Sequence, residues 1–299
     1  MNDKVEYDAH ADEWDKILAE GSSDNIGNTW NYTDNLDYWR HQRMYKFALP
    51  VIETAPNASW LTVGDGRYGR DGIALKRLGA KSITCTDMSA TLLKRAKELQ
   101  LIEEYSEQNA EKMTFDDDEF DFIFCKESFH HFPRPFNGLH ELKRVARCGV
   151  ILIEPRDLNI DRSPLHFILK FINYFASGKI LSHKFEPVGN YVFQLSLRET
   201  EKFLLGIHCT EFAYFELNDA YTKGIEFVHL DSQKYNDVLK KISVKGKIFL
   251  QNILSFVGIM KPRLLGIYIP NEELTVVKKQ LLTNQGWKIM NLPKNPFKK

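Results

Sequence analysis

The sequence predicts an α/β fold in which helices cover both faces of a central, mostly parallel sheet. Between residues 58 and 156, short apolar runs alternate with segments of helical periodicity, a pattern typical of strand and helix units around such a sheet. The composition agrees, because 43% of the 299 residues are hydrophobic and 27% are charged. These values exclude wholesale disorder, collagen and coiled coil, and the length allows one large domain or two small ones.

The elements of this region follow one another in a regular order. Four apolar runs are expected strands: 59–64, 82–87, 120–125 and 148–155. Helices are expected over 70–78 and from Pro135 onward, because each has an apolar face and a recognisable start or stop. A further helix is expected after the second strand, with Ser89 as its cap and a buried stripe of Leu92, Ala96 and Leu99.

The second half of the chain is expected to add helices and strands to this sheet. Ser196, with Glu199 three residues later, is typical of a helix start. Later strands are expected over 211–217 and 264–269, and helical segments over about 232–258 and 272–283. We therefore expect an N-terminal cap segment over residues 1–50 and a cofactor-binding core over residues 51–160. A C-terminal part over residues 161–299 is expected to cover the substrate and complete the sheet.

Two later segments are unusually apolar for helices. Segment 163–178 begins with Ser163 and Pro164, and its polar side chains form one narrow stripe: His166, Lys170 and Asn173. Segment 248–260 is similar and is broken only by Gln251, Asn252 and Ser255. Neither reaches the length of a membrane span. We expect burial or homo-oligomer contacts for these helices, with peripheral membrane contact as the other reading.

The overall charge is neutral but unevenly distributed. Forty basic and forty acidic residues cancel, so no nucleic-acid partner is expected. Residues 1–40 hold ten acidic and three basic side chains, whereas residues 233–299 hold thirteen basic and three acidic ones. The basic end can face an acidic partner or a membrane surface, or it can be an ordinary solvated face.

The cysteines and the N-terminus bear on metal binding and compartment. Four cysteines lie far apart in sequence without a short Cys/His cluster: Cys85, Cys125, Cys148 and Cys209. Neither a disulfide framework nor a metal site is therefore expected. The first residues are acidic and lack the apolar stretch of a secretory signal, and we expect a cytoplasmic protein.

A glycine-rich turn follows the first expected strand, with the sequence Gly64-Asp65-Gly66-Arg67-Tyr68-Gly69. Glycines between a strand and a helix let the backbone bend tightly and let a ligand approach it closely. Asp87 ends the second strand, where its carboxylate can accept both hydroxyls of a ribose. This combination predicts an adenosine-containing cofactor, and a nicotinamide dinucleotide is one cofactor that fits it.

Further motifs follow this turn. They are Asn109 to Phe115 with an acidic turn behind it, FDFIFCKESFHHF at 120–132, a helix, and CGVILIEP at 148–155. Together they resemble the class I S-adenosylmethionine-dependent methyltransferases, and most of all the small-molecule branch that includes the quinone-biosynthesis methyltransferases. The likeness is close over 58–156. The segment from Tyr7 to Asp15 loosely resembles the part that precedes the fold in that branch.

The resemblance implies a Rossmann-like class I methyltransferase fold with helical N-terminal and C-terminal additions, and S-adenosyl-L-methionine as the cofactor. It assigns cofactor contacts, from the methionine half through the ribose to the adenine, to Gly64, Asp65, Gly66, Asp87, Met88, Asn109 and Ala110. Lys126 and Glu127 are placed under the methionine and the substrate.

Three positions depart from the family pattern. Thr62 stands where an acid is usual, and Tyr68 stands where a glycine is usual. Asp65 or an N-terminal acid could take the place of the missing acid. Asn109 replaces a commoner aspartate, and its side-chain oxygen can still accept a hydrogen bond from the adenine amine.

Candidate catalytic residues follow the strand over 120–125. Because the methyl donor is already activated, the protein mainly aligns the reactants and excludes water. An oxygen or nitrogen nucleophile of high pKa also needs a general base. Glu127, His130 and His131 lie at the expected carboxyl edge of the sheet and are candidates for this role or for substrate contact. Glu154 is a further candidate, and each can instead be a packing or capping residue.

Substrate specificity is expected in two segments that cover the site. One spans 156–191 and includes His183, Lys184, Glu186, Asn190 and Tyr191. The other spans 30–43 and includes Tyr38, Trp39, Arg40 and Arg43. Its aromatic and basic residues can hold an anionic or sugar-like substrate, or can anchor a helix to the core.

The sequence therefore predicts methyl transfer from S-adenosylmethionine to a small-molecule or glycan-like acceptor, with oxygen as the expected site of methylation. A nicotinamide-dependent oxidoreductase is one alternative, since it uses the same glycine turn. A methyltransferase-like domain that binds a ligand or partner without turnover is the other, and Thr62 and Tyr68 are its motivation.

Overall fold

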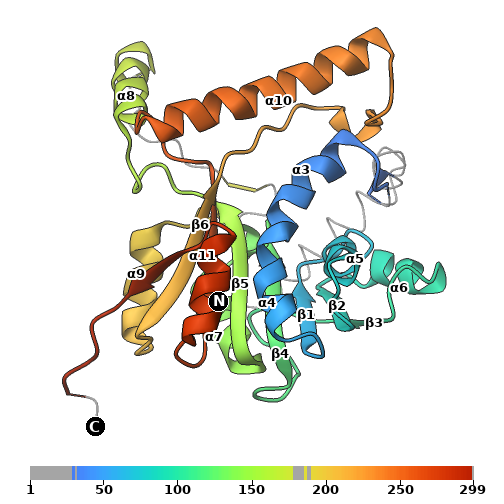
Figure 1. Ribbon diagram of the computed structural model, residues 1–299, viewed down its shortest axis with the longest axis vertical. Helices are drawn as coiled ribbons and strands as arrows, with labels where there is room; N and C mark the ends of the chain where they lie inside the picture. The colour runs from blue at the N-terminus through green and yellow to red at the C-terminus, as the bar shows by residue number, and fades with distance from the viewer. Residues whose placement is uncertain (1–28, 31, 178–184, 187–189, 298–299) are drawn as a thin grey trace.

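The computed structural model describes residues 29–30, 32–177, 185–186 and 190–297. Its centre is an eight-stranded sheet in the order β3-β2-β1-β4-β5-β7-β6-β8. Helices pack on both faces of this sheet (Figure 1). The predicted α/β architecture is confirmed.

Five strands form a parallel half: β1 (Ser59–Val63), β2 (Ser82–Asp87), β3 (Glu104–Glu107), β4 (Phe120–Lys126) and β5 (Ala146–Pro155). β1 lies between β2 and β4, and Val63 pairs with Thr86 on one side and with Cys125 on the other. After β1 the chain builds β2 and β3 on one side of β1, and it then crosses to the other side of β1 to form β4 and β5. Such a switch point opens a crevice at the carboxyl ends of β1 and β4, where ligands bind in sheets of this kind.

Three later strands complete the sheet: β6 (Glu211–Leu217), β7 (Leu264–Pro270) and β8 (Lys288–Asn291). β7 inserts between β5 and β6 and runs antiparallel to both, and β8 pairs antiparallel with β6. The strands predicted over 211–217 and 264–269 are confirmed. β3 and β8 lack an apolar run because they are the edge strands, where side chains are half-buried or exposed.

Successive strand residues point to opposite faces of the sheet, so the core divides into two clusters. Trp60 and Phe122 belong to the face covered by α4 (Leu49–Thr54), α5 (Arg70–Arg77) and α11 (Val276–Asn284). Leu61 and Ile123 belong to the face covered by α7 (Pro135–Val145) and α9 (Leu197–Gly206). A smaller cluster holds α6 (Thr91–Glu98) beside β2 and β3.

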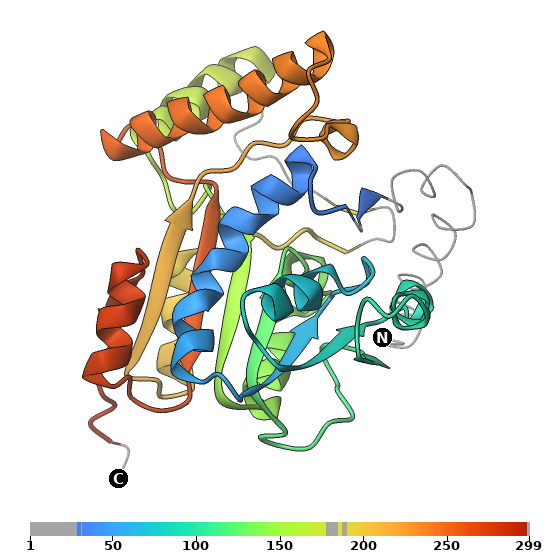
Figure 2. The same ribbon diagram turned by 45° about the vertical axis from the view of Figure 1, so that its right-hand side comes forward.

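Three helices lie beyond the carboxyl edge of the parallel strands (Figures 1 and 2). α3 (Leu36–Tyr45) continues through a short 3-10 turn at Lys46–Ala48 into α4, and its first residue packs under α10 (Tyr235–Phe256). α8 (Pro164–Ser177) lies beside the C-terminal half of α10, where the Leu165 N–H donates to the Ile259 carbonyl at 2.9 Å. Among the helices of the described residues, none has both the length and the apolar character that crossing a membrane requires.

Two local predictions for α6 are wrong. The helix begins at Thr91 after Ala90, and the Ser89 N–H instead donates to the Asp87 carboxylate at 3.0 Å. Leu99 follows the end of the helix and is 54% exposed, since the buried residues are Leu92, Leu93 and Ala96. The predicted start of α9 is confirmed, because Ser196 Oγ accepts a hydrogen bond from the Glu199 N–H at 3.1 Å.

Burial of the two apolar segments is also a wrong prediction within this chain. Phe171 and Phe175 of α8 are 59% and 72% exposed, and Phe249 and Phe256 of α10 are 67% and 92% exposed. α8 does begin as predicted, with the His166 N–H donating to Ser163 Oγ at 3.3 Å. The apolar composition of these helices therefore reflects something other than packing on the sheet.

Gly266→Ala is expected to lower the free energy of unfolding by about 1–3 kcal/mol, as overpacking of a dense core does. An added Cβ would lie 1.9 Å from Phe215 Cε1, and the Phe215 ring is itself stacked on Phe47. Gly246→Ala in α10 is the matched control, because no described atom lies within 4 Å of its added Cβ. Because alanine favours a helix more than glycine does, Gly246→Ala is expected to raise the free energy of unfolding by up to about 1 kcal/mol. Equal stabilities of the two variants in urea denaturation would contradict the packing described here.

Candidate functional site

The glycine turn after β1 packs directly against the loop after β4. A Cβ on Gly64 would lie 1.8 Å from Ser128 Oγ, and Gly64 has a φ of 74°, so a side chain at this position would clash and strain the backbone. Ser128 Oγ in turn donates to the Val63 carbonyl at 3.3 Å. The ends of β1 and β4 therefore form one continuous edge at the switch point of the sheet.

Asp87 reaches this turn from the end of β2. Its carboxylate accepts hydrogen bonds from the Gly66 N–H at 2.8 Å and from the Ser89 N–H at 3.0 Å. Burial raises the pKa of Asp87, although these N–H donors act in the opposite direction. A carboxylate has about four lone-pair positions, so its oxygens can also accept hydroxyl donors. Asp87 thus links the end of β2 to the glycine turn, and its contact with a ribose stays a prediction.

Asp65 and Thr62 are bound to each other beneath the turn. The Asp65 carboxyl accepts hydrogen bonds from Thr62 Oγ1 at 2.8 Å and from the N–H groups of Asp71 and Gly72 at 2.9 Å each. Burial and the neighbouring Asp71 carboxylate raise the pKa of Asp65 to about 8. Asp65 therefore brings a carboxyl group to the position where the sequence lacks one, and there it holds the first turn of α5.

Tyr68 adopts a backbone conformation that glycine prefers. Its φ is 61°, which costs a residue with a side chain about 1–2 kcal/mol. The side chain is almost completely buried in a cluster with Trp30, Leu93 and Ile102. Burial of a large aromatic ring offsets this strain and fixes the end of the turn.

The residues predicted at the adenine lie at the ends of β2 and β3. Met88 directly follows Asp87, and Ala110 packs at the edge of the core. Asn109 Oδ1 accepts a hydrogen bond from the Glu111 N–H at 2.9 Å, which shapes its loop. Glu111 also forms an ion pair with Arg134 at 3.2 Å, so the loops after β3 and β4 are joined.

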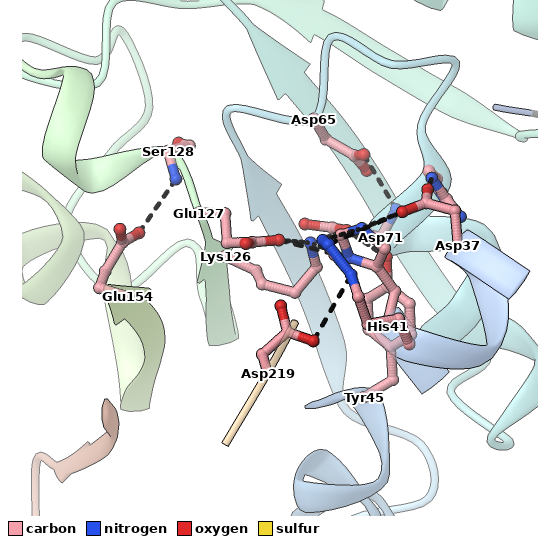
Figure 3. Close-up of polar contacts among 12 residues, drawn as sticks. Asp37, His41, Tyr45, Asp65, Asp71, Lys126, Glu127, Ser128, Glu154 and Asp219 are labelled. Atoms are coloured by element: carbon pink, nitrogen blue, oxygen red, sulfur yellow. Dashed lines mark hydrogen bonds and ion pairs between the residues drawn. The ribbon is translucent and has the colours of Figure 1, made fainter. Parts of the chain in front are cut away.

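A buried group of charged side chains lies where β4 ends (Figure 3). Lys126 Nζ is 3.1 Å from His41 Nδ1, 3.3 Å from Glu127 Oε2 and 3.4 Å from Asp71 Oδ1. Three elements meet at this amine, because His41 comes from α3, Asp71 from α5 and Lys126 from β4. The Lys126 cluster, as we name it, comprises Asp37, Arg40, His41, Tyr45, Arg70, Asp71, Lys126, Glu127 and Asp219.

The outer members of the Lys126 cluster extend these contacts. The Tyr45 hydroxyl donates to Asp71 Oδ1 at 2.6 Å, and Arg70 pairs with Asp37 at 2.8 Å. Arg40 lies 3.5 Å from Asp219, which follows β6 and is distant in sequence. The cluster thus ties the carboxyl ends of strands from both halves of the sheet to α3.

The cations of the cluster keep the carboxylates of Asp37 and Glu127 ionised. Although burial favours the neutral acid, Lys126 and Arg40 hold the pKa of Glu127 well below its usual range. Burial and the Lys126 charge lower the pKa of His41 to about 3, so this imidazole is neutral near pH 7. Glu127 also has a φ of 52°, a strained conformation for a residue with a side chain. It is therefore a fixed anion and a poor proton acceptor.

His130 has the opposite character. Its Nδ1 lies 2.6 Å from Glu154 Oε2, and Glu154 is fully buried at the end of β5. Glu154 Oε1 accepts hydrogen bonds from the N–H groups of Ser128 and Phe129 at 3.0 and 2.9 Å, so the carboxylate is rigidly placed. Burial lowers the pKa of His130, but the Glu154 carboxylate outweighs it and the pKa is raised. A histidine held at Nδ1 by a carboxylate presents Nε2 for proton transfer.

His131 lies further out than His130. Its side chain is 46% exposed, its Nδ1 pairs with Glu186, and its ring centroid is 3.9 Å from that of His130. Asn190 Nδ2 donates to the His131 carbonyl at 2.8 Å and to Glu186 at 2.8 Å. Glu186 and Asn190 of the predicted covering segment thus do reach the candidate site.

Several contributors to the site were not predicted. Asp37 and His41 are four residues apart on one face of α3, and this spacing is the only sequence signal for them. Asp71 and Asp219 carry no comparable signal. In the predicted covering segment 30–43, Arg40 and Arg43 face inward, and Arg43 donates to the Asn218 carbonyl at 2.9 Å. Two predicted contributors lie outside the described residues: the segment Tyr7 to Asp15, and the pair His183 and Lys184.

Metal ligands and reactive thiols were also considered as parts of a site. In the ranges the structure describes, no group of three His, Cys, Asp or Glu side chains could hold a metal ion. None of the four cysteines forms a disulfide. Burial raises the pKa of Cys85 and Cys125 well above the usual value, which makes both thiols poor nucleophiles.

Residues 61–153 match the family model of a methyltransferase domain. The matched segment runs from β1 to β5 and contains the glycine turn, Asp87, Lys126 and His130. This match confirms the resemblance stated from the sequence, and with it S-adenosylmethionine as the methyl donor of the domain.

Individual proteins are similar to parts of the chain. It is 25% identical over 130 residues to 2-methyl-6-phytyl-1,4-hydroquinone methyltransferase 2, chloroplastic, of Oryza sativa subsp. japonica, a match that covers 42% of this chain and 35% of the relative. The chain thus spans about a third of the length of that curated relative.

Two solved structures illustrate the similarity of fold. A magnesium protoporphyrin IX methyltransferase from Synechocystis PCC 6803 with bound SAH is 13% identical with a TM-score of 0.46, over 85% of this chain and 99% of that one. A SAM-dependent methyltransferase from Methanosarcina mazei is 16% identical with a TM-score of 0.45, over 76% of this chain and 98% of that one.

Lys126→Met is expected to lower the free energy of unfolding by about 3 kcal/mol, because Asp71 and Glu127 would remain buried without this cation. Adding Glu127→Gln should recover part of the loss, since it removes one of the uncompensated charges. Lys97→Met is the control: its pair with Glu104 is exposed, and we expect a change below about 1 kcal/mol. Similar losses for the two lysine variants in urea denaturation would contradict a buried cluster.

Proposed function

We propose that this chain, whose residues 61–153 form a methyltransferase domain, transfers the methyl group of S-adenosylmethionine to a hydroxyl group of a small-molecule acceptor. The observation that carries the proposal is the meeting of three parts at one edge of the sheet: the glycine turn after β1, Asp87 after β2, and His130 with Glu154 after β4 and β5. The curated relative is named for a hydroquinone, and a phenolic hydroxyl compound is the acceptor class we favour over a glycan-like one.

The residues at the glycine turn fit the proposed cofactor. At Gly64 and Gly66, the absence of a side chain lets the turn pack closely against Ser128 and against the Asp87 carboxylate, and this carboxylate has lone pairs for two hydroxyls. Met88, Asn109 and Ala110 continue from this point along the ends of β2 and β3, on the adenine side. When bound, the cofactor supplies an activated methyl group on a positively charged sulfur.

Glu127 suits the cationic half of the cofactor better than it suits proton transfer. Its side chain is 25% exposed, so it borders the crevice while the Lys126 cluster holds it in place. Lys126 and Arg40 keep it ionised despite its burial. We therefore assign Glu127 to the methionine ammonium group or the sulfonium, where a fixed negative charge stabilises binding.

His130 is the general base in this proposal. It takes the proton of the acceptor hydroxyl at Nε2 as the new oxygen–carbon bond forms and the sulfur–carbon bond breaks. Glu154 stabilises the resulting imidazolium through Nδ1 and fixes the orientation of the ring. A hydroxyl nucleophile needs a general base, and His130 with Glu154 can serve as one, so we favour oxygen as the methylated atom. His131, more exposed and paired with Glu186, is assigned to substrate contact.

Asp87→Ala is expected to weaken S-adenosylmethionine binding by about tenfold or more in isothermal titration calorimetry, because two ribose hydroxyls lose a charged acceptor. Asp117→Ala is the control, since Asp117 is 76% exposed and pairs with Arg144 on another part of the surface. Unchanged binding by Asp87→Ala would contradict the assignment. Binding of a nicotinamide dinucleotide in place of S-adenosylmethionine would support the oxidoreductase alternative instead.

A pH profile tests His130 as the base. The base must be neutral, so kcat with a methyl-substituted hydroquinone acceptor should fall as pH drops through the pKa of His130, which Glu154 raises. Glu154→Gln should move this midpoint to lower pH, because the charge that raises the pKa is gone. His130→Ala should lower kcat by about 10²–10⁴-fold.

The matched control for the pH profile is His131→Ala, which is expected to change KM more than kcat. A midpoint that Glu154→Gln leaves unmoved would show that His130 only packs against Glu154. S-adenosylhomocysteine formation is the readout throughout.

A further inference from the structure

Helix α10 has two apolar faces, and only one of them is used by the fold. The inner face packs on α3 and on the loop before α10, through Val244 and Ile248 against Leu36 and Ile225. Asn218 Nδ2 also donates to Asn252 Oδ1 at 3.1 Å and to Ser255 Oγ at 2.9 Å. α10 is therefore firmly attached, and its other face is exposed because of where the helix lies.

The outer face of α10 is a continuous apolar stripe. Its exposed side chains are 44–92% accessible: Tyr235, Leu239, Ile242, Phe249, Leu250, Ile253, Phe256 and Val257. At about 100° per residue they fall within a stripe roughly 120° wide, on the side opposite Val244 and Ile248. A stripe of this width is what a helix presents to a second apolar phase.

Helix α8 extends this surface. Seven of its apolar side chains are 47–72% exposed: Phe167, Ile168, Leu169, Phe171, Ile172, Tyr174 and Phe175. Figures 1 and 2 place α8 and α10 together on the same side of the molecule, away from α7, α9 and α11. We call the two sets of exposed residues the α8/α10 face. A contiguous apolar surface of this extent marks an interaction site.

Basic side chains predominate around the α8/α10 face. α10 holds one acid, Asp237, in its first turn, where it accepts a hydrogen bond from Ser232 Oγ at 2.6 Å, and helical spacing places it on the inner side. Neither 163–177 nor 238–271 contains an acidic residue, whereas they contain Lys170, Lys240, Lys241, Lys245, Lys247, Lys261 and Arg263. On α10, Lys245 and Lys247 lie on the two sides of the apolar stripe. Lys240 and Lys241 donate to backbone carbonyls of the preceding loop, which directs their ammonium groups toward the inner face of α10.

We propose that the α8/α10 face docks on an anionic lipid membrane, with its aromatic and aliphatic side chains in the outer acyl layer and its lysines at the headgroups. Aromatic and aliphatic residues bordered by Lys are the composition of helices that lie in a membrane interface. This location goes beyond the proposed methyl transfer. It places the carboxyl ends of the parallel strands, which lie on the same side of the sheet as α3 and α10, toward the lipid surface.

Charge decides between a membrane and a second copy of the chain. In a two-fold dimer the same surface patch faces itself. Two α8/α10 faces would bring Lys170, Lys245 and Lys247 of each copy together, and the one acid of the two helices, Asp237, lies on the inner side of α10. Anionic headgroups supply the missing negative charge, and the apolar side chains supply the depth of insertion.

Co-sedimentation with lipid vesicles tests this proposal without cofactor or acceptor, so its outcome is independent of methyl transfer. The full chain is mixed with vesicles of phosphatidylcholine and phosphatidylglycerol in equal parts, or of phosphatidylcholine alone. We expect binding to the anionic vesicles at low ionic strength, weaker binding at high ionic strength, and weaker binding to phosphatidylcholine.

The decisive variant is F171S/F175S/F249S/F256S, which removes four exposed rings and is expected to lower vesicle binding by at least about tenfold. V276S/V277S is the matched control, because these residues are 83% and 67% exposed on α11 and lie outside the face. It should bind as the parent chain does, and thermal unfolding of both variants should match that of the parent chain.

Three results would overturn the proposal. The first is recovery of the chain in the supernatant with both vesicle types at low ionic strength. The second is equal vesicle binding by the four-ring variant and the parent chain. The third is a dimer in analytical ultracentrifugation that the four-ring variant converts to monomer, which would assign the face to self-association.

Discussion

The buried ammonium group of Lys126 is the interaction on which the candidate site depends. A charge taken out of water must be matched by partners at close range, and here they come from α3, α5 and the residue after Lys126 itself. These partners leave little freedom in how α3 crosses the carboxyl edge of the sheet. α3 in turn packs against α10, so the contacts of Lys126 help to fix where both helices lie beyond the carboxyl edge of the sheet.

The same constraint separates two carboxylates that look alike in sequence. Glu127 lies beside cations and stays ionised. Glu154 is instead bound by backbone N–H groups and by the imidazole of His130, whose pKa it raises. One carboxylate is thereby suited to hold a positive charge and the other to support a base. Residue type alone could not distinguish these roles, since both follow strands at the same edge. The environment distinguishes them through the sign of the neighbouring charges.

The sequence predicts what depends on nearby residues and misses what depends on distant ones. Strands β1, β2, β4 and β5 and the contact between Gly66 and Asp87 belong to one regular unit, so periodicity and glycine spacing suffice. Asp219 meets Arg40 only after the chain has built six strands, β1 to β6, and no local pattern indicates that contact. The edge strands β3 and β8 are missed because half-exposed strands have no apolar run.

The apolar helices show a different limit of sequence reasoning. Composition predicts that α8 and the end of α10 avoid water, but it does not say what replaces the water. The fold removes the simplest answer, because the sheet already has both faces covered and α10 already has its inner face packed. The neutral net charge is also unevenly distributed in space. The described acids of the Lys126 cluster lie under α3, whereas the surface of α8 and α10 is predominantly basic and its one acid, Asp237, lies on the inner side of α10. An outer phase that is both apolar and anionic satisfies the two requirements together, and the outer layer of a membrane is such a phase.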